Sequence, residues 1–137
     1  MDIQNTNKEY YTTNTLVYSC QYHVIWTTKY RRPVLTAPIQ ERLKQLVLEK
    51  QDYLVFKVIE IEVMEDHVHL LIDSSPYVGI YRTVNQLKGY TSRILRKEFK
   101  DLKSRIPSLW TRSKFVSTVG SVSLETVKKY IEGQKNK

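Results

Sequence analysis

The sequence predicts an α+β fold, an antiparallel sheet with helices on one side. Its 137 residues are enough for one domain with a single apolar core. Apolar residues make up 41% and charged residues 26%, which is typical of a folded globular chain and excludes a disordered or fibrous one. Segments with the alternation of strands are mixed with two longer segments that have the period of helices, and this mixture favours the α+β class.

The first part of the chain contains a polar stretch, a strand pattern and a helical pattern. Residues 1–14 are polar and without periodicity, so we expect a flexible N-terminal arm. Residues 17–27 are rich in β-branched and aromatic side chains and predict the first strand. After a loop with two prolines over residues 31–38, apolar residues recur at helical spacing from Ile39 to about residue 52, which predicts the first helix.

Two further strand patterns follow this helix. Residues 53–64 predict a second strand in which Ile59, Ile61 and Val63 share one face. A turn comes next, and residues 67–72 predict a third, short strand. Residues typical of loops follow directly and end it.

The second half predicts a long basic helix, a strand and a last helix. Apolar residues recur at helical spacing over residues 79–102, and residues 109–119 read as the fourth strand. A final helix is expected from Leu124 to about residue 134, with Ser123 as its cap. The order β-α-β-β-α-β predicts a ferredoxin-like or RRM-like antiparallel sheet with an extra C-terminal helix, in one domain over residues 15–137.

Positive charge is concentrated in one part of the chain. The formal net charge is +8, and the segment from Arg82 to Lys114 alone holds ten basic residues against two acidic ones, which is the whole excess. A second cluster, Lys29 to Arg32, places a tyrosine among three cations. A solvated helix face is the ordinary explanation of such a run, but this concentration favours contact with the phosphates of nucleic acid.

Several classes of protein are excluded by what the sequence lacks. A single cysteine, Cys20, excludes a disulfide framework and an all-cysteine metal site. There is no glycine-rich phosphate-binding loop followed by lysine, so we expect no nucleotide cofactor. No segment has the length of apolar residues that a membrane span needs, and the N-terminus lacks a secretory pattern. We therefore expect a soluble cytoplasmic protein without a membrane partner.

The segment His67-Val68-His69 is the sharpest local motif. Alternate residues of a strand project from the same face, so both imidazoles point one way while Val68 points into the core. Two neutral imidazoles suit a transition metal or manganese, with oxygen ligands such as Glu65 or Asp66 completing the sphere. Two surface histidines without a metal would give the same pattern.

Tyr130 and Gln134 form a second pair. They stand four residues apart on the last predicted helix and therefore share a face. The amide oxygen of Gln134 could bind a metal ion, and Lys128 and Lys129 could attract a phosphate. A tyrosine that covers the edge of the core, and a satisfied structural histidine at His23, remain the simpler explanations for these side chains.

Taken together, these segments resemble the single-tyrosine HUH transposases of the insertion sequence 200/605 type, the IS200-like family. The resemblance covers nearly the whole chain, from about residue 17 to residue 134. It rests on Tyr22-His23-Val24-Ile25-Trp26, Lys29-Tyr30-Arg31-Arg32, Val34-Leu35, Met64-Glu65-Asp66-His67-Val68-His69-Leu70-Leu71-Ile72, Leu87-Lys88-Gly89 and the pair Tyr130 and Gln134.

The resemblance implies an activity and a role for four residues. Tyr130 would be the nucleophile that attacks a phosphodiester of single-stranded DNA, leaving a 5′-phosphotyrosine. His67, His69 and Gln134 would bind a divalent metal, Mg²⁺ or Mn²⁺. Hairpins near the ends of the insertion sequence would be the DNA partner. A homodimer with composite active sites, in which the helix of Tyr130 docks on the partner's histidine pair, is also implied.

Two alternatives stay open at this point. One is a non-catalytic, RRM-like module that binds nucleic acid through its sheet and basic helices. The other is a domesticated transposase that acts on dispersed genomic repeats. For the hairpin DNA that the resemblance implies, we expect contacts from Lys29, Arg31, Arg32, Arg82, Lys88, Arg93, Arg96 and Lys97.

Overall fold

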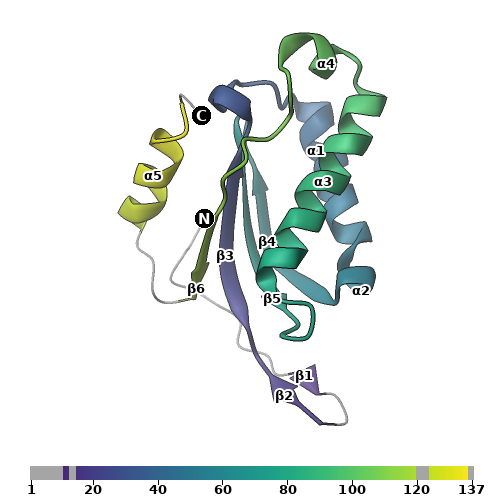
Figure 1. Cartoon of the computed structure of the whole chain (residues 1–137), viewed down its shortest axis with the longest axis vertical. Helices are drawn as coiled ribbons and strands as arrows, with labels where there is room; N and C mark the ends of the chain where they lie inside the picture. Colours follow the sequence, from purple (N-terminus) through teal and green to yellow (C-terminus); the bar gives the residue numbers. More distant parts are fainter. Residues whose placement is uncertain (1–10, 13–14, 120–123, 136–137) are drawn as a thin grey trace.

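The computed structural model describes residues 11–12, 15–119 and 124–135 (Figure 1). The main elements, in chain order, are β3 (Gln21–Thr27), α1 (Ala37–Glu49), β4 (Phe56–Val63), β5 (His67–Ser74), α3 (Ile80–Glu98), β6 (Phe115–Thr118) and α5 (Leu124–Glu132). Five short elements complete the described chain: β1 (Tyr11–Thr12), β2 (Val17–Tyr18), the 3₁₀ helix η1 (Lys29–Arg31), α2 (Gln51–Leu54) and α4 (Asp101–Arg105).

The main sheet has the strand order β4-β5-β3-β6, and every neighbouring pair is antiparallel. Helices α1 and α3 lie on one face of this sheet, and α5 lies on the other (Figure 1). The predicted α+β class, the order β-α-β-β-α-β and the additional C-terminal helix are confirmed. The two longest strand pairings are β3 with β5 and β4 with β5, so β5 is paired along its length on both sides.

The core lies between the sheet and the helices α1 and α3. On β5, Val68, Leu70 and Ile72 are completely buried, as their alternation predicts. They belong to the same cluster as Trp26 of β3 and Leu87 of α3. Within the described part of the chain, no helix combines the length and apolar character that crossing a membrane requires.

The first predicted strand, residues 17–27, is interrupted. Val17 and Tyr18 pair with Tyr11 and Thr12 in a separate two-stranded sheet, so part of the predicted arm is a strand. The main strand begins only at Gln21, which pairs with Asp73. This pairing also extends β5 two residues beyond its predicted end.

In the second predicted strand, the prediction that Ile59 shares a face with Ile61 and Val63 is wrong. Val58 pairs with Ile72 and Glu60 pairs with Leu71, so Ile59 is the extra residue of a β-bulge. A bulge shifts the alternation by one position. Val58, and not Ile59, therefore packs on the core.

The second half differs from the prediction at the end of the long helix and at the start of the last strand. The long helix ends at Glu98, and Asp101–Arg105 forms the separate helix α4. Only Phe115–Thr118 of the predicted strand 109–119 pairs with β3. The residues before it form an irregular segment, 109–114, held at Trp110 by a single bridge to Thr28. The proposed cap, Ser123, lies outside the described residues.

Leu87 offers a test of the core. It is completely buried on α3, and we expect Leu87→Ala to lower the free energy of unfolding by about 2–5 kcal/mol, because truncation removes apolar contacts and leaves a cavity. Leu48→Ala on the exposed side of α1 is the matched control. It should lower the free energy of unfolding by much less, since Leu48 is 46% exposed. Urea unfolding of both variants measures the difference. Equal losses would contradict the placement of α3 on the core.

Candidate active site

The two motif histidines lie on the face of the sheet that is turned away from α1 and α3. His69 is paired with Ile25 and His67 with Thr27 on the neighbouring strand. Because Val68 and Leu70 point into the core, the histidines point to the opposite face. The alternation predicted for this motif is therefore confirmed.

His67 is held in place by a carboxylate. Its Nδ1 lies 2.7 Å from Asp66 Oδ1, and Arg31 Nε donates to Asp66 Oδ2 at 2.8 Å. Burial opposes ionisation of Asp66, but the hydrogen bonds from His67 and Arg31 outweigh it and hold the pKa of this carboxyl below its usual value. A carboxylate accepts hydrogen bonds, so His67 Nδ1 donates to Asp66, and a metal ion would be bound through Nε2.

His69 is buried, with only 3% of its surface exposed. Burial lowers its pKa to about 3, and the nearby imidazoles of His23 and His67 add to the effect. The ring is neutral at pH 7, the form that binds metal ions. His69 Nε2 lies 3.3 Å from Nδ1 of His23, which is itself completely buried. The structural role expected for His23 therefore includes direct contact with one of the motif histidines.

Tyr130 reaches the same face of the sheet from α5. Its ring packs against Phe115 of β6, with the ring centroids 5.3 Å apart, and against Ile25 of β3. Ile25 is the register partner of His69, so α5 covers strands next to the histidine pair. Burial raises the pKa of the Tyr130 phenol above its usual value.

Ser113 joins Tyr130 to Gln134. Its Oγ lies 3.4 Å from Tyr130 Oη and donates to Gln134 Oε1 at 2.8 Å. Tyr130 and Gln134 therefore share a face, as their spacing predicts. Gln134 follows the end of α5 in a tightened turn, where its backbone N–H donates to the carbonyl of Ile131. Its side chain is buried, with 4% exposed.

The two imidazoles on this face have the chemistry to bind a divalent metal ion. Among the described residues, no three His, Cys, Asp or Glu side chains come together as a metal cage. Gln134 could add an amide oxygen, which keeps one lone pair beside the bond from Ser113. Asp66 is occupied by His67 and Arg31, which gives it an orienting position and not that of a ligand. Glu65 is exposed on the turn.

The predicted DNA-binding cations fall into two groups. Arg31 is bonded to Asp66, and Arg96 Nη1 donates to the carbonyl of Ile106 at 3.2 Å. Lys29 is half-buried with its ammonium over the ring of Tyr30. The other surface cations are exposed, and they are Arg32, Arg82, Arg93 and Lys97.

Lys88 is not on the surface. It is 9% exposed and donates from Nζ to the carbonyls of Thr111, Arg112 and Ser113, at 2.7, 3.3 and 3.0 Å. Burial lowers its pKa to about 8, and the charge of Lys114 adds to the effect. Because its protons are directed at backbone carbonyls inside the protein, Lys88 leaves the set of candidate DNA contacts.

One residue of this site, Ser113, was missed from the sequence, as were the orienting roles of Asp66 and Arg31. Ser113 is one of several serines without a motif, and only the fold brings it to Tyr130. The roles of Asp66 and Arg31 in orienting His67 come from contacts between residues 35 positions apart. The one available signal was position, since Asp66 precedes His67 directly.

A sequence profile of the family described as "Transposase IS200 like" matches residues 16–134, which is most of the chain. The chain belongs to the IS200-like transposase family. It is 36% identical over 123 residues to the ISDra2 transposase TnpA of Deinococcus radiodurans, with 88% of each chain covered. It is 27% identical over 119 residues to the transposase for insertion sequence element IS200 of Salmonella typhimurium, covering 85% of this chain and 78% of that one.

Solved structures resemble this IS200-like transposase as well. A Deinococcus radiodurans R1 protein assigned as a transposase has a TM-score of 0.84 at 33% identity, over 90% of this chain and 97% of that one. A REP-associated tyrosine transposase bound to a REP hairpin has a TM-score of 0.55 at 9% identity, over 88% of this chain and 69% of that one. The second likeness is one of fold.

Lys88 makes the stability of this IS200-like transposase depend on pH. The folded chain releases the Lys88 proton near pH 8, whereas the unfolded chain holds it to about 10.5. Between these values the unfolded state binds more protons, so the free energy of unfolding rises with pH relative to a Lys88→Met variant. Urea unfolding of both proteins from pH 7 to pH 10 measures this. If the difference in free energy of unfolding between the two proteins stayed constant with pH, Lys88 would have the same pKa in the folded and the unfolded state.

Proposed function

We propose that this transposase cleaves and rejoins single-stranded DNA at the ends of an insertion sequence, with Tyr130 as the nucleophile. The observation that carries the proposal is the common face. His67 and His69 from β5, and Tyr130 from α5, lie on the side of the sheet that α1 and α3 leave uncovered. A tyrosine and two metal-competent imidazoles on one face are what metal-assisted transesterification needs.

In the proposed reaction, Tyr130 Oη attacks the phosphorus of the scissile phosphodiester. A bond forms between Oη and phosphorus, and the bond from phosphorus to the 3′ oxygen breaks. The phenol gives up one proton and the departing 3′ oxygen takes one, so the products are a 5′-phosphotyrosine and a free 3′-OH. The new ester retains the energy of the old one, so a second 3′-OH can reverse the step without a nucleotide cofactor.

The chain positions the Tyr130 ring and its oxygen. Packing against Phe115 and Ile25 fixes the Tyr130 ring, and Ser113 holds its oxygen. The phenol is protonated at pH 7, as an ordinary tyrosine is, and burial raises its pKa further. His67, His69 and Gln134 would hold Mg²⁺ or Mn²⁺, and the chemistry gained is polarisation of the phosphate and stabilisation of negative charge on the leaving oxygen.

We also propose a homodimer with composite sites, in which α5 can dock on the histidine pair of the partner. This part of the proposal rests on the family resemblance. In the described chain α5 lies against the sheet of its own chain (Figure 1).

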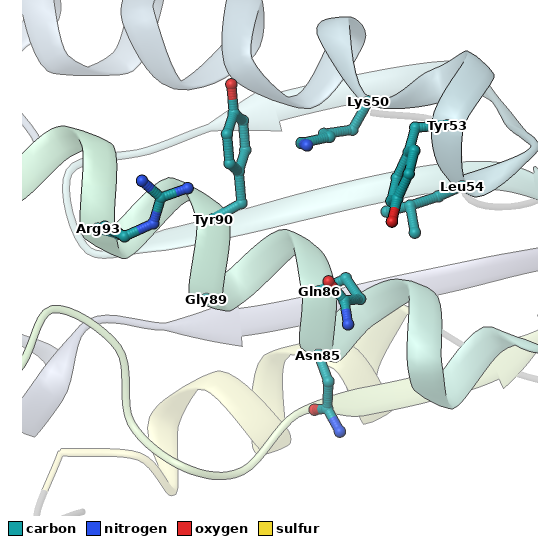
Figure 2. A pocket seen from close by; sticks show the side chains of 8 residues that line it. All are labelled: Lys50, Tyr53, Leu54, Asn85, Gln86, Gly89, Tyr90 and Arg93. Carbon is teal, nitrogen blue, oxygen red and sulfur yellow. The ribbon is translucent and has the colours of Figure 1, made fainter.

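Hairpin DNA is the proposed partner, and the exposed face of α3 is its proposed contact surface. Arg82, Arg93 and Lys97 recur at helical intervals, so they share a stripe of α3. This stripe borders a pocket of about 450 Å³ between α3 and the α1–α2 corner, which Arg93 and Tyr53 line (Figure 2). Cations beside aromatic rings suit backbone contact and base stacking.

Two details of this pocket support a DNA contact. Lys50 Nζ lies 4.9 Å from the ring centroid of Tyr53 and 4.2 Å from that of Tyr90, so positive charge sits among the rings (Figure 2). Gly89, in the middle of α3, has nothing within 4 Å of where a Cβ would stand. A glycine there costs the helix about 1 kcal/mol relative to alanine and leaves the backbone open to a ligand.

A covalent adduct tests the proposed reaction. Incubation with labelled single-stranded DNA from the ends of the element, in Mg²⁺ or Mn²⁺, should give a protein–DNA adduct on a denaturing gel. Tyr130→Phe should abolish it because the attacking oxygen is gone, and EDTA should abolish it by removing the metal. Tyr81→Phe, which removes an exposed hydroxyl on α3, is the matched control and should form the adduct normally.

If wild-type protein forms no adduct but binds the hairpin, the tyrosine chemistry is absent and a non-catalytic binding module is the better description. An adduct that persists in Tyr130→Phe would identify a different nucleophile. An adduct that forms fully in EDTA would remove the metal from the proposal.

Charge reversal tests the DNA surface. Arg93→Glu combined with Lys97→Glu should weaken hairpin binding, and the slope of log K against log salt should fall by about 0.9 for each phosphate that the variant no longer neutralises. Fluorescence anisotropy with a labelled hairpin at several salt concentrations measures both. Lys44→Glu on α1 reverses one charge elsewhere and should leave the slope unaltered. An unaltered slope in the double variant would place the DNA on another surface.

A further inference from the structure

Lys88 is a buried cation whose hydrogen bonds are all made to one short segment. Its Nζ donates to three successive backbone carbonyls, those of Thr111, Arg112 and Ser113. An ammonium group has three protons, so each carbonyl can take one. An apolar side chain of the same length would fill this space without the cost of burying a charge. The role of the Lys88 ammonium is therefore to bind the backbone of residues 111–113, and not to fill space in the core.

The segment that Lys88 holds would otherwise have few regular bonds. It lies between α4 and β6, and outside the paired strand. Thr111 donates its N–H to the carbonyl of Thr27, and the indole of Trp110 donates to Thr91 Oγ1, one turn after Lys88 on α3. These two bonds secure its beginning. The carbonyls of residues 112 and 113 are held by Lys88.

Ser113 is the point at which this segment meets the candidate active site. Its carbonyl accepts from Lys88, while its hydroxyl contacts Tyr130 Oη and donates to Gln134 Oε1. The hydroxyl has a single proton, which goes to Gln134, so its lone pairs accept the proton of Tyr130. Ser113 thus fixes the side chain of Tyr130 on α5 and that of Gln134 just after it. Lys88 fixes the backbone of Ser113 from the opposite side.

We propose that Lys88 is a positioning residue for Tyr130 and Gln134, acting through Ser113. This inference rests on the proposed function, since it concerns the placement of its nucleophile and of one proposed ligand. Lys88 sets the position of the Ser113 backbone, and the Ser113 hydroxyl then sets where the phenol oxygen and the amide oxygen lie above the histidine face. Loss of the ammonium would free residues 112 and 113 and displace both oxygens.

The test combines Lys88→Met with Ser113→Ala, singly and together. Single-turnover cleavage of labelled single-stranded DNA at saturating concentration should slow by between about tenfold and a hundredfold in each single variant, because misplacement of a reacting group has effects of this size. The hairpin Kd should stay within about twofold of wild type. The double variant should be no slower than the slower single one, because both changes break the same connection.

Three controls separate positioning from general damage. Lys103→Met makes the same chemical change at an exposed site on α4 and should keep the wild-type rate. Ser113→Thr retains the hydroxyl and should retain most of the rate. The NMR signals of the Gln134 side-chain amide and the Tyr130 ring, measured without metal or DNA, should move in Lys88→Met as they do in Ser113→Ala.

A wild-type cleavage rate in Lys88→Met, or rate losses that multiply in the double variant, would overturn the inference. If Lys88→Met does not fold, Ser113→Ala decides, and unchanged Gln134 and Tyr130 signals in it would overturn the inference equally. Failure of the proposed function is distinguishable, because wild-type protein would then form no adduct while the NMR comparison would still report the connection.

Discussion

The alternation of side chains along β5 governs both the core and the candidate site of this transposase. Val68, Leu70 and Ile72 are buried beneath α1 and α3, and their burial commits the intervening His67 and His69 to the opposite face. A shift of register by one residue would place imidazoles in the core and apolar side chains at the site. The long pairings of β5 with β3 and with β4 hold this register. The stability of the core and the direction of the candidate ligands are therefore one property of the fold.

Lys88 and Ser113 connect the helical layer to the opposite face of the sheet. The helical layer contributes Lys88, and the opposite face receives α5 with Tyr130. Between them runs an irregular segment, whose residue Ser113 contacts both sides. The hydrogen bonds of Ser113 link the backbone of this segment to the positions of the phenol and amide oxygens.

Much of the fold and of the site was predictable from periodicity. The strand alternation of residues 67–72 and the helical spacing of the long basic helix depend on burial that neighbouring residues reveal. The spacing of Tyr130 and Gln134 predicted that they share a face, and both reach Ser113. The errors occurred where pairing with another strand decides. A bulge places Val58 on the core in place of Ile59. The predicted first strand is interrupted before Gln21 because Val17 and Tyr18 pair with Thr12 and Tyr11.

Fold class, family and candidate chemistry could be inferred from the amino-acid sequence alone, because they depend on local patterns and on motifs in order. Which cations are available depends instead on tertiary packing. Lys88 and Arg93 lie on the same basic helix, yet one is turned toward three carbonyls and the other lines a surface pocket. Packing likewise brings Asp66 to His67, His23 to His69 and Ser113 to Tyr130. Apart from the adjacent Asp66, these contacts join residues far apart in the chain, and a local pattern carries no information about which distant polar group will satisfy a buried one.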